Sequence, residues 1–301
     1  MCALGGCAAA GPADPATTGS PSVEPAAAGS GTTDLMVFGA AATGENPDLF
    51  TIRLDGTERV QLTDDPAFDA CATFGPDART VVFCSDRSGA FEIWATDIEG
   101  ATARQLTSIG GFATFPDVSP DGRTVAFCAN APGEPEETED LWTVGLDGSA
   151  PIRITDTPKA SDCYPSWSPD GDRTAFVSSR EDGPNVWVVN ADGSGATRLT
   201  TDSGVAEQLP DWSPDGSSIA FAADGEVWTM DADGSAAEPI TSGVETEFSP
   251  AWTGDGDRIV YRVIDRAAAR NELWVMSADG GDAQRIPGVE DDDAFRPAVA
   301  W

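Results

Sequence analysis

The stretch Trp212-Ser213-Pro214-Asp215-Gly216-Ser217-Ser218-Ile219-Ala220-Phe221 predicts two strands joined by a tight turn. Ser, Pro, Asp and Gly in this order favour a type I turn, because the fixed φ of proline suits the second position and glycine accepts a positive φ at the fourth. The flanking Trp212 and the run from Ile219 to Phe221 supply the two arms of a hairpin. Similar stretches recur along the chain, so this hairpin is a repeating unit.

Four landmarks recur with a period of about 45 residues. The turn recurs at Gly75–Ala78, Ser119–Gly122, Ser168–Gly171, Ser213–Gly216 and Gly254–Asp257. The last of these is a degenerate copy without the proline. An aromatic residue of a later strand recurs at Phe50, Trp94, Trp142, Trp187, Trp228 and Trp274. A turn glycine follows at Gly56, Gly100, Gly148, Gly193, Gly234 and Gly280. Each unit closes with Leu-Thr or Ile-Thr beginning at residues 62, 106, 154, 199 and 240, or with Ile286-Pro287. Four strands per period of this length are typical of a propeller blade.

These landmarks predict an all-β fold over residues 34–301, a six-bladed β-propeller with four antiparallel strands per blade. Six units carry the aromatic residue, the glycine and the closing pair, but the first unit lacks its first strand. The run Arg296-Pro297-Ala298-Val299 matches Phe115-Pro116-Asp117-Val118, which leads into an innermost strand. We therefore expect the C-terminal strand to join the N-terminal blade and close the ring, which also removes an open sheet edge.

The Trp-Ser-Pro-Asp-Gly, Ile-Ala-Phe, Glu-Val-Trp, Asp-Gly-Ser and Leu-Thr segments resemble the WD40-like repeats of the TolB-type six-bladed propellers. The resemblance covers roughly residues 34–301 and is specific for the fold. It does not specify an activity, because such repeats occur in periplasmic interaction proteins and in non-catalytic domains of peptidases. TolB itself also has an α/β domain before its propeller, for which residues 1–33 are too short, so the resemblance does not imply a TolB role in envelope translocation.

The chain is strongly acidic, with 17 Lys and Arg against 51 Asp and Glu and a net charge of −34. This balance excludes nucleic acid as a partner, since phosphate contacts need clustered Lys and Arg. Two interpretations stay open: a solvated acidic surface that maintains solubility, or attraction of cations or of a basic partner. No apolar run approaches the length of a membrane span.

Residues 1–33 predict a lipobox-like start followed by a disordered tether, because residues 8–33 are almost entirely Ala, Pro, Gly, Ser and Thr. Leu4-Gly5-Gly6-Cys7 resembles the lipobox of bacterial lipoproteins, which implies lipidation of Cys7. The alternative is a chance match in a stretch of small residues, since no basic residue precedes Arg53. The resemblance implies a protein exported to the periplasm or the cell surface and held at the membrane only by a lipid anchor.

Four cysteines lie in the repeat region, and an even number suits a disulfide-forming compartment. Aligned to the turn prolines, Cys71 begins a first strand and Cys84 ends the paired second strand, so these two are the natural pair within one blade. Cys128 would then pair with Cys163 of the next blade. Four cysteines allow three pairings, and free buried thiols are the alternative. A zinc site is not favoured, because no Cys-x-x-Cys spacing or histidine accompanies them.

The tryptophans occupy repeating positions, which predicts blade packing rather than ligand binding. Catalytic patterns are largely missing from the sequence. It contains no histidine for a Ser-His-Asp arrangement, no Gly-x-Ser-x-Gly elbow and no phosphate loop. What remains is carboxylate chemistry or a hard metal ion.

One group of carboxylates lies at an equivalent position at the start of the innermost strand. Its members, the candidate ligand-binding residues, are Asp69, Asp162, Glu207 and Glu247. They would surround one mouth of the central channel, and a ring of oxygen ligands suits Ca²⁺. The alternative is that these side chains cap local turns and strand ends.

Together these patterns predict a monomeric, exported and lipid-anchored propeller without catalytic activity, which binds a protein or peptide, possibly basic, at an acidic channel mouth. The alternative hypothesis is a carbohydrate-binding protein, or an enzyme that uses carboxylates and a divalent cation at this mouth.

Overall fold

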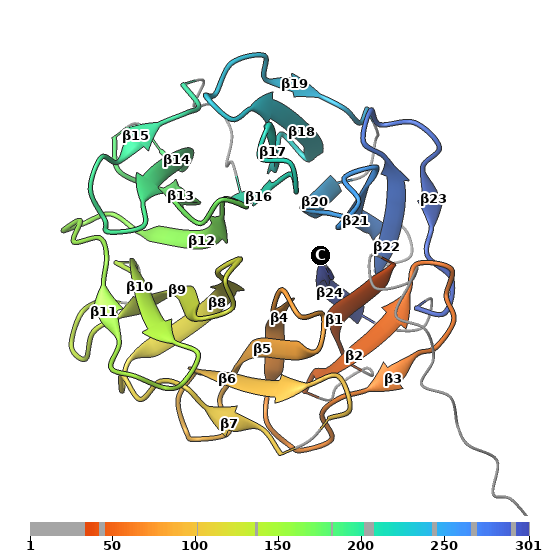
Figure 1. Cartoon of the computed structure of the whole chain (residues 1–301). Coiled ribbons are helices and arrows are strands. Elements are labelled where there is room, and N and C mark those ends of the chain that lie inside the picture. Colours follow the sequence, from red (N-terminus) through yellow and green to blue (C-terminus); the bar gives the residue numbers. More distant parts are fainter. Residues whose placement is uncertain are drawn as a thin grey trace, which may run out of the picture. The chain divides into compact units, whose positions relative to one another are not determined.

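The computed structural model describes residues 34–41, 46–100, 102–135, 138–181, 183–201, 208–242, 246–265, 270–289 and 293–300. Within this part of the chain, six four-stranded antiparallel sheets are arranged around a central axis (Figure 1). The predicted fold class is therefore confirmed, including the number of blades and the number of strands in each. The described residues contain no helix that could cross a membrane.

Each blade has four strands, which are numbered here from the central axis outward. The innermost strands are β4 (Asp69–Phe74), β8 (Phe112–Val118), β12 (Asp162–Trp167), β16 (Gln208–Trp212), β20 (Thr246–Trp252) and β24 (Asp293–Val299). The second strands are β1 (Leu35–Ala41), β5 (Thr80–Ser85), β9 (Thr124–Asn130), β13 (Arg173–Ser178), β17 (Ser218–Ala223) and β21 (Arg258–Asp265). The third strands are β2 (Asp48–Arg53), β6 (Glu92–Asp97), β10 (Asp140–Gly145), β14 (Asn185–Asn190), β18 (Glu226–Asp231) and β22 (Arg270–Ser277). The short outer strands are β3 (Val60–Gln61), β7 (Arg104–Gln105), β11 (Ile152–Arg153), β15 (Thr197–Arg198), β19 (Glu238–Pro239) and β23 (Gln284–Arg285).

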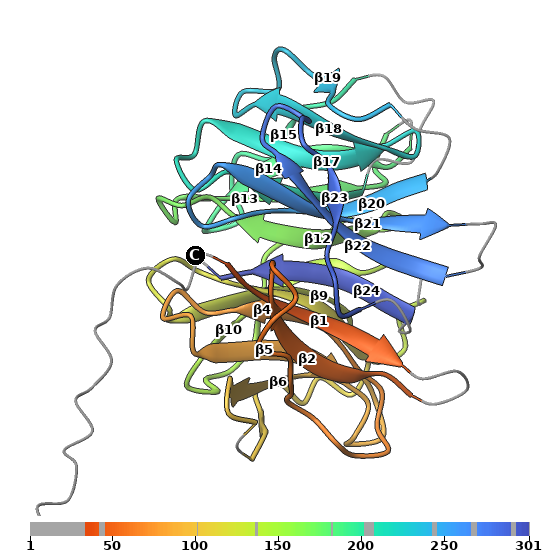
Figure 2. The ribbon, with the colours of Figure 1, turned by 90° about the vertical axis from the view of Figure 1, so that its right-hand side faces the viewer.

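The C-terminal strand closes the ring as predicted. β24 pairs antiparallel with β1, with Met36 opposite Val299 and Ala40 opposite Ala294. Figures 1 and 2 show β24, the last strand of the chain, lying beside β1, the first. The first blade therefore contains strands from both ends of the described chain, and its second strand, β1, is paired on both sides, with β24 and with β2.

The repeated turn has the geometry that its sequence predicts. In the second copy the Gly122 N–H donates to the Ser119 carbonyl at 2.8 Å, and Gly122 has a φ of +70°. Asp121 Oδ1 accepts from the Ser119 hydroxyl and from the Arg123 N–H, which fixes the turn. A Cβ on Gly122 would lie 3.3 Å from Pro76 of the preceding turn. Glycine therefore serves the turn conformation and also the close approach of neighbouring blades.

The closing Leu-Thr pair connects the outer strand to the third strand of the same blade. Its threonine hydroxyl accepts the N–H of the second residue of the third strand, for example Thr155 from Leu141 at 3.0 Å. The same bond recurs at Thr63, Thr107, Thr200 and Thr241. Leucines and isoleucines preceding these threonines contribute to the apolar contacts between blades, and Leu62 and Leu106 are buried. The repeat landmarks are thus structural positions.

Candidate functional site

All six innermost strands contain a β-bulge, and each bulge carries one residue with a positive φ. These residues, here named the bulge ring, are Cys71, Phe115, Tyr164, Leu209, Ser249 and Arg296, with φ between +41° and +59°. None is glycine, so each conformation costs about 1 kcal/mol or more. A bulge redirects a side chain, and bulges are frequent beside functional sites.

The bulge ring lines one cavity of about 410 Å³ at an end of the central channel. This volume lies within the range of small-ligand sites, which are mostly apolar with a few polar groups. A larger groove of about 620 Å³ lies between outer parts of two blades, beside Arg104 and Ile152, but it is more open. The channel cavity is the better candidate, because every described blade contributes a side chain to it.

Aromatic rings form much of the cavity wall. Phe68, Phe91 and Phe112 contact one another in edge-to-face pairs, with ring centroids 5.6 Å and 5.0 Å apart. Phe115 and Tyr164 of the bulge ring form another pair at 4.5 Å. Such pairs hold the rings in fixed orientations, so the wall is preorganised for a ligand with an apolar part.

Arg296 is the cation of the bulge ring. Its guanidinium carbon lies 4.8 Å from the centroid of the Phe115 ring, in cation–π contact. Its Nη1 atom is buried and donates no hydrogen bond within the described part of the chain. Arg296 also lines the next cavity down the channel, of about 50 Å³. The residue thus lies where the two spaces meet.

The smaller cavity is surrounded by a layer of polar side chains two residues after the bulge. Asp117 Oδ2 accepts the Trp167 N–H at 2.7 Å, and Asp211 Oδ2 accepts the Trp252 N–H at 2.7 Å. Between these blades, Ser166 Oγ accepts the Trp212 N–H at 3.2 Å. Each bond connects an innermost strand to that of the next blade. These three side chains, Asp117, Ser166 and Asp211, are here named the polar ring, and they connect neighbouring blades.

The two carboxylates of the polar ring have raised pKa values. Burial raises the pKa of Asp117 to about 6 and that of Asp211 to about 7, although the tryptophan N–H donors and the charge of Arg296 act in the opposite direction. The charge of Asp117 further raises the pKa of Asp211. Desolvation disfavours the ionised form, and here it exceeds the stabilising contacts.

The predicted rim carboxylates Asp69 and Asp162 lie two residues before the bulge, fully buried and outside both channel cavities. Asp69 Oδ2 accepts from Arg87 Nη2 at 2.6 Å, and Asp162 Oδ2 accepts from Arg180 Nη2 at 2.5 Å. Ser178 Oγ also donates to Asp162 at 2.5 Å. Each arginine lies over aromatic rings of its own blade, as Arg180 does over Trp187 at 4.9 Å. The contacts of Asp69 and Asp162 agree with the alternative interpretation of the sequence, in which these carboxylates cap local turns and strand ends.

The other two predicted members differ from this pair. Glu247 lies at the equivalent position of β20 and is 8% exposed. Burial of the Tyr261 hydroxyl and the charge of Glu247 raise the pKa of Tyr261 to about 12. Glu207 lies outside the described residues, as do Cys7 and the tether. The three described members, Asp69, Asp162 and Glu247, do not line the channel cavities. Around the described mouth the structure places aromatic rings and arginines instead.

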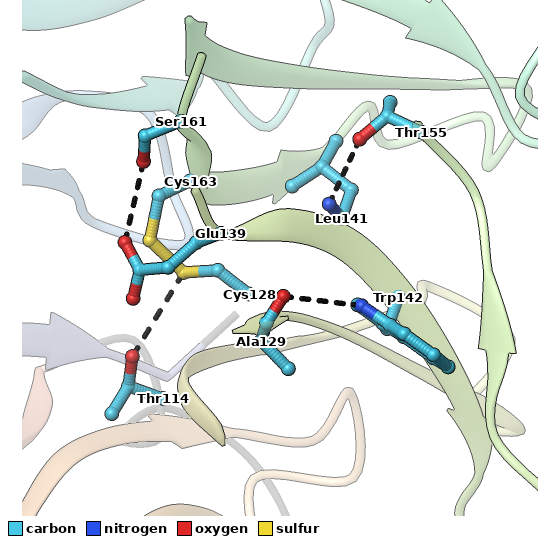
Figure 3. The surroundings of a disulfide bond; sticks show 9 residues. All are labelled: Thr114, Cys128, Ala129, Glu139, Leu141, Trp142, Thr155, Ser161 and Cys163. Carbon is cyan, nitrogen blue, oxygen red and sulfur yellow. Dashed lines mark hydrogen bonds between the residues drawn. A yellow bond between two sulfur atoms is a disulfide. The ribbon is translucent and has the colours of Figure 1, made fainter. Parts of the chain in front are cut away.

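The cysteines form one bonded and one unbonded pair. Cys128 of β9 and Cys163 of β12 form a disulfide that connects neighbouring blades (Figure 3). Glu139 lies beside this bond and accepts from the Ser161 hydroxyl at 3.3 Å. The expected bond between Cys71 and Cys84 is absent, and both are thiols. The bulge turns Cys71 into the channel cavity, while the Cys84 thiol donates to the Ala70 carbonyl at 3.3 Å.

The tryptophans occupy packing positions, as expected. Trp167, Trp212 and Trp252 are buried, and Trp228 Nε1 donates to the Ala223 carbonyl at 3.0 Å. No tryptophan in the described part of the chain lines either channel cavity.

Sequence reasoning missed the bulge ring, although the chain contains a signal for it. In five of the six units the bulge residue directly precedes a proline, at 116, 165, 210, 250 and 297. The residue types at the bulge differ in every blade, whereas the proline that follows recurs in five of the six. A position that varies within an otherwise regular repeat, and faces a cavity, is where a propeller can specify a ligand.

Comparison with known proteins gives consistent results. The model of the family described as TolB beta propeller domain matches residues 15–136 and 131–297. Over 231 residues the chain is 30% identical to an uncharacterised protein of Agrobacterium fabrum. The alignment covers 76% of this chain and 64% of that protein. The chain thus spans less than two thirds of this relative's length.

Solved structures share the fold at low identity. TolB from Acinetobacter baumannii superposes with a TM-score of 0.75 and 21% identity, over 89% of this chain and 67% of that one. A putative TolB from Agrobacterium tumefaciens superposes with a TM-score of 0.67 and 19% identity, over 87% of this chain and 96% of that one.

Proposed function

Because the chain belongs to the TolB β-propeller domain family, we propose that it is an exported, non-enzymatic propeller that binds a protein or peptide. The binding site is the channel cavity lined by the bulge ring. The observation that carries this proposal is the cavity itself, where six strained, non-repeating side chains from six blades converge.

Backbone strain supports a role in binding. Six non-glycine residues of six different types adopt a positive φ at one equivalent position, and packing alone does not require six different side chains there. The rings of Phe91 and Phe112 offer apolar area, and Tyr164 and Ser249 offer hydroxyl groups. This combination suits a peptide segment with apolar side chains and a few polar groups.

Binding is favoured over catalysis by the chemistry of the lining. The one nucleophile of note is the Cys71 thiol, whose pKa is lowered by the neighbouring Cys84 side chain and by the charge of Arg296, although burial acts in the opposite direction. The chain has no histidine to act as a general base beside it. The rim acids Asp69 and Asp162 are bound to arginines, which does not favour the carboxylate-dependent enzyme.

Site-specific photocrosslinking tests the binding site. We would replace Phe112, which lines the cavity and is 36% exposed, with a photoreactive phenylalanine analogue in the native host. The matched control carries the same analogue at Val60 of the outer strand β3, which is 45% exposed. We expect a discrete adduct with one protein from position 112 only. Equal labelling from both positions, or none from position 112, would overturn the proposal.

Export and anchoring form a separate part of the proposal, which rests on Leu4-Gly5-Gly6-Cys7. Lipidation of Cys7 would hold the propeller at the membrane through the tether of residues 8–33. Mass spectrometry of the N-terminal peptide from membrane fractions should detect a diacylglyceryl adduct on Cys7. An unmodified Cys7 in the same fractions would contradict the anchor without affecting the binding site.

A further inference from the structure

Arg296 differs in its partners from Arg87 and Arg180, the arginines that contact the rim aspartates. Arg87 and Arg180 each form an ion pair with a buried aspartate at 2.6 Å and 2.5 Å. No carboxylate among the described residues lies within ion-pair distance of Arg296, although the chain has three acidic residues for every basic one. An unpaired guanidinium N–H that is shielded from water is unfavourable, and an anion that accepts it gains a strong hydrogen bond.

The nearest acids do not fulfil this role. The charge of Arg296 acts to lower the pKa values of Asp117 and Asp211. Each of these carboxylates, however, directs an oxygen to a tryptophan backbone N–H of the next blade. They are committed to the polar ring below the cavity. Arg296 itself lines the cavity, where it lies with Phe115, Tyr164 and the Cys71 thiol and has no carboxylate partner among the described residues.

The shape of the site limits what the anion is attached to. The cation–π contact with Phe115 positions the guanidinium, and the rings of Phe68, Phe91 and Phe112 line the same cavity. A free inorganic anion would leave these rings without a partner. A cavity of about 410 Å³ accommodates a carboxylate side chain together with an adjacent apolar side chain.

We propose that Arg296 binds the side-chain carboxylate of an Asp or Glu in the partner peptide, with an apolar residue beside it on the phenylalanine wall. This inference rests on the proposed peptide-binding function and names the chemistry of the ligand. The proposed ligand residue is acidic, whereas the net charge of the chain favoured a basic partner. The difference arises because the lining of this cavity is cationic and aromatic even though the whole chain is acidic. Salt near 0.15 M screens the repulsion from distant acidic residues much more strongly than a contact ion pair in a partly buried site.

Positional-scanning peptide libraries test this specificity. The peptides are acetylated and amidated, so that the central position is their only charge, and it is fixed as Glu, Gln or Lys between mixed apolar residues. We expect the Glu library to bind the full chain at least about tenfold more strongly than the Gln library, and the Lys library to bind weakest. A fourth library with Gln and a free C-terminus distinguishes a terminal carboxylate from a side-chain carboxylate, and preferential binding of that library would overturn the proposed source.

Variants assign the preference to Arg296. R296Q should remove the Glu over Gln preference, whereas R296K should retain part of it. The matched control is R79Q, which removes an exposed arginine at the opposite end of the β4–β5 hairpin and should leave the preference unchanged. Thermal unfolding of each variant confirms that it is folded, and R296K keeps the test decisive if R296Q does not fold.

The possible failures are distinguishable. If all libraries bind equally and R296Q changes nothing, while F112A abolishes binding, the carboxylate inference fails and the peptide-binding cavity stands. If no library binds the wild type, the carboxylate inference is overturned, and photocrosslinking from position 112 then decides whether the proposed function falls with it.

Discussion

Two pairs of aspartates lie at two levels of the innermost strands, two residues before and two residues after the bulge, and their environments differ. Asp69 and Asp162 at the rim are each bound to an arginine of the same blade. Asp117 and Asp211 in the polar ring accept backbone N–H groups of the next blade, and their pKa values are raised. The comparison teaches that the position of a carboxylate within the repeat does not define its role. The neighbouring blade and the available cation define it.

Removal of a rim carboxylate should have the largest effect. D162N leaves Arg180 beside a neutral amide in a buried site, and breaking such a pair costs about 3 to 5 kcal/mol of unfolding free energy. Guanidinium denaturation at neutral pH measures the loss. The control is D172N, an exposed turn residue, which should change stability by less than about 0.5 kcal/mol. A loss below about 1 kcal/mol for D162N would remove the distinction between the two pairs.

The two cysteine pairs extend the comparison from charges to crosslinks. The Cys128–Cys163 disulfide connects two blades across 35 residues, so replacing both cysteines by serine should cost about 2 to 4 kcal/mol. Replacement of Cys71 by alanine should cost only about 1 kcal/mol, because this residue has no bond to lose. Alkylation of the unfolded protein before reduction, followed by peptide mapping, should label Cys71 and Cys84 alone among these four. Labelling of Cys128 would contradict the assignment.

An aspartate of the polar ring should respond in the opposite direction to a rim aspartate. The folded protein holds the proton of Asp211 up to about pH 7, whereas the unfolded chain releases it near pH 4. The carboxylate therefore makes stability fall as the pH rises from about 4 to 7. D211N removes this ionisation and keeps an oxygen to accept the Trp252 N–H, so it should stabilise the fold by about 1 to 3 kcal/mol at pH 8 and by little at pH 4. Denaturation curves at both values test the sign, and destabilisation at pH 8 would show that the charge is needed.

Calcium should have the smallest effect. A ring of rim carboxylates would favour Ca²⁺, but Asp69 and Asp162 direct oxygens to arginines and lie outside the channel cavities. We expect about 1 mM Ca²⁺ to shift the melting temperature by less than about one degree. A larger shift that disappears in D69N would restore the cation site predicted from the sequence, and R87Q, which frees Asp69 from its partner, serves as the comparison variant.

The sequence alone determined the architecture. Turn chemistry, the aromatic position, the turn glycine and the closing Leu-Thr pair are local, and each recurs often enough to predict six blades and the closure by the C-terminal strand. They succeed because a repeated unit must bury the same faces against the same neighbours, so that its local pattern is also its packing pattern.

Only the tertiary structure decided the site. Equivalent carboxylates suggested an acidic mouth, but Arg87 and Arg180 lie 18 residues further along the chain and meet Asp69 and Asp162 through the hairpin. The direction of Cys71, Tyr164 and Arg296 depends on a backbone bulge that no propensity of these residues predicts. Which side chains face one cavity depends on strands from six blades converging on one axis, and that convergence is a property of the closed ring, not of any single repeat.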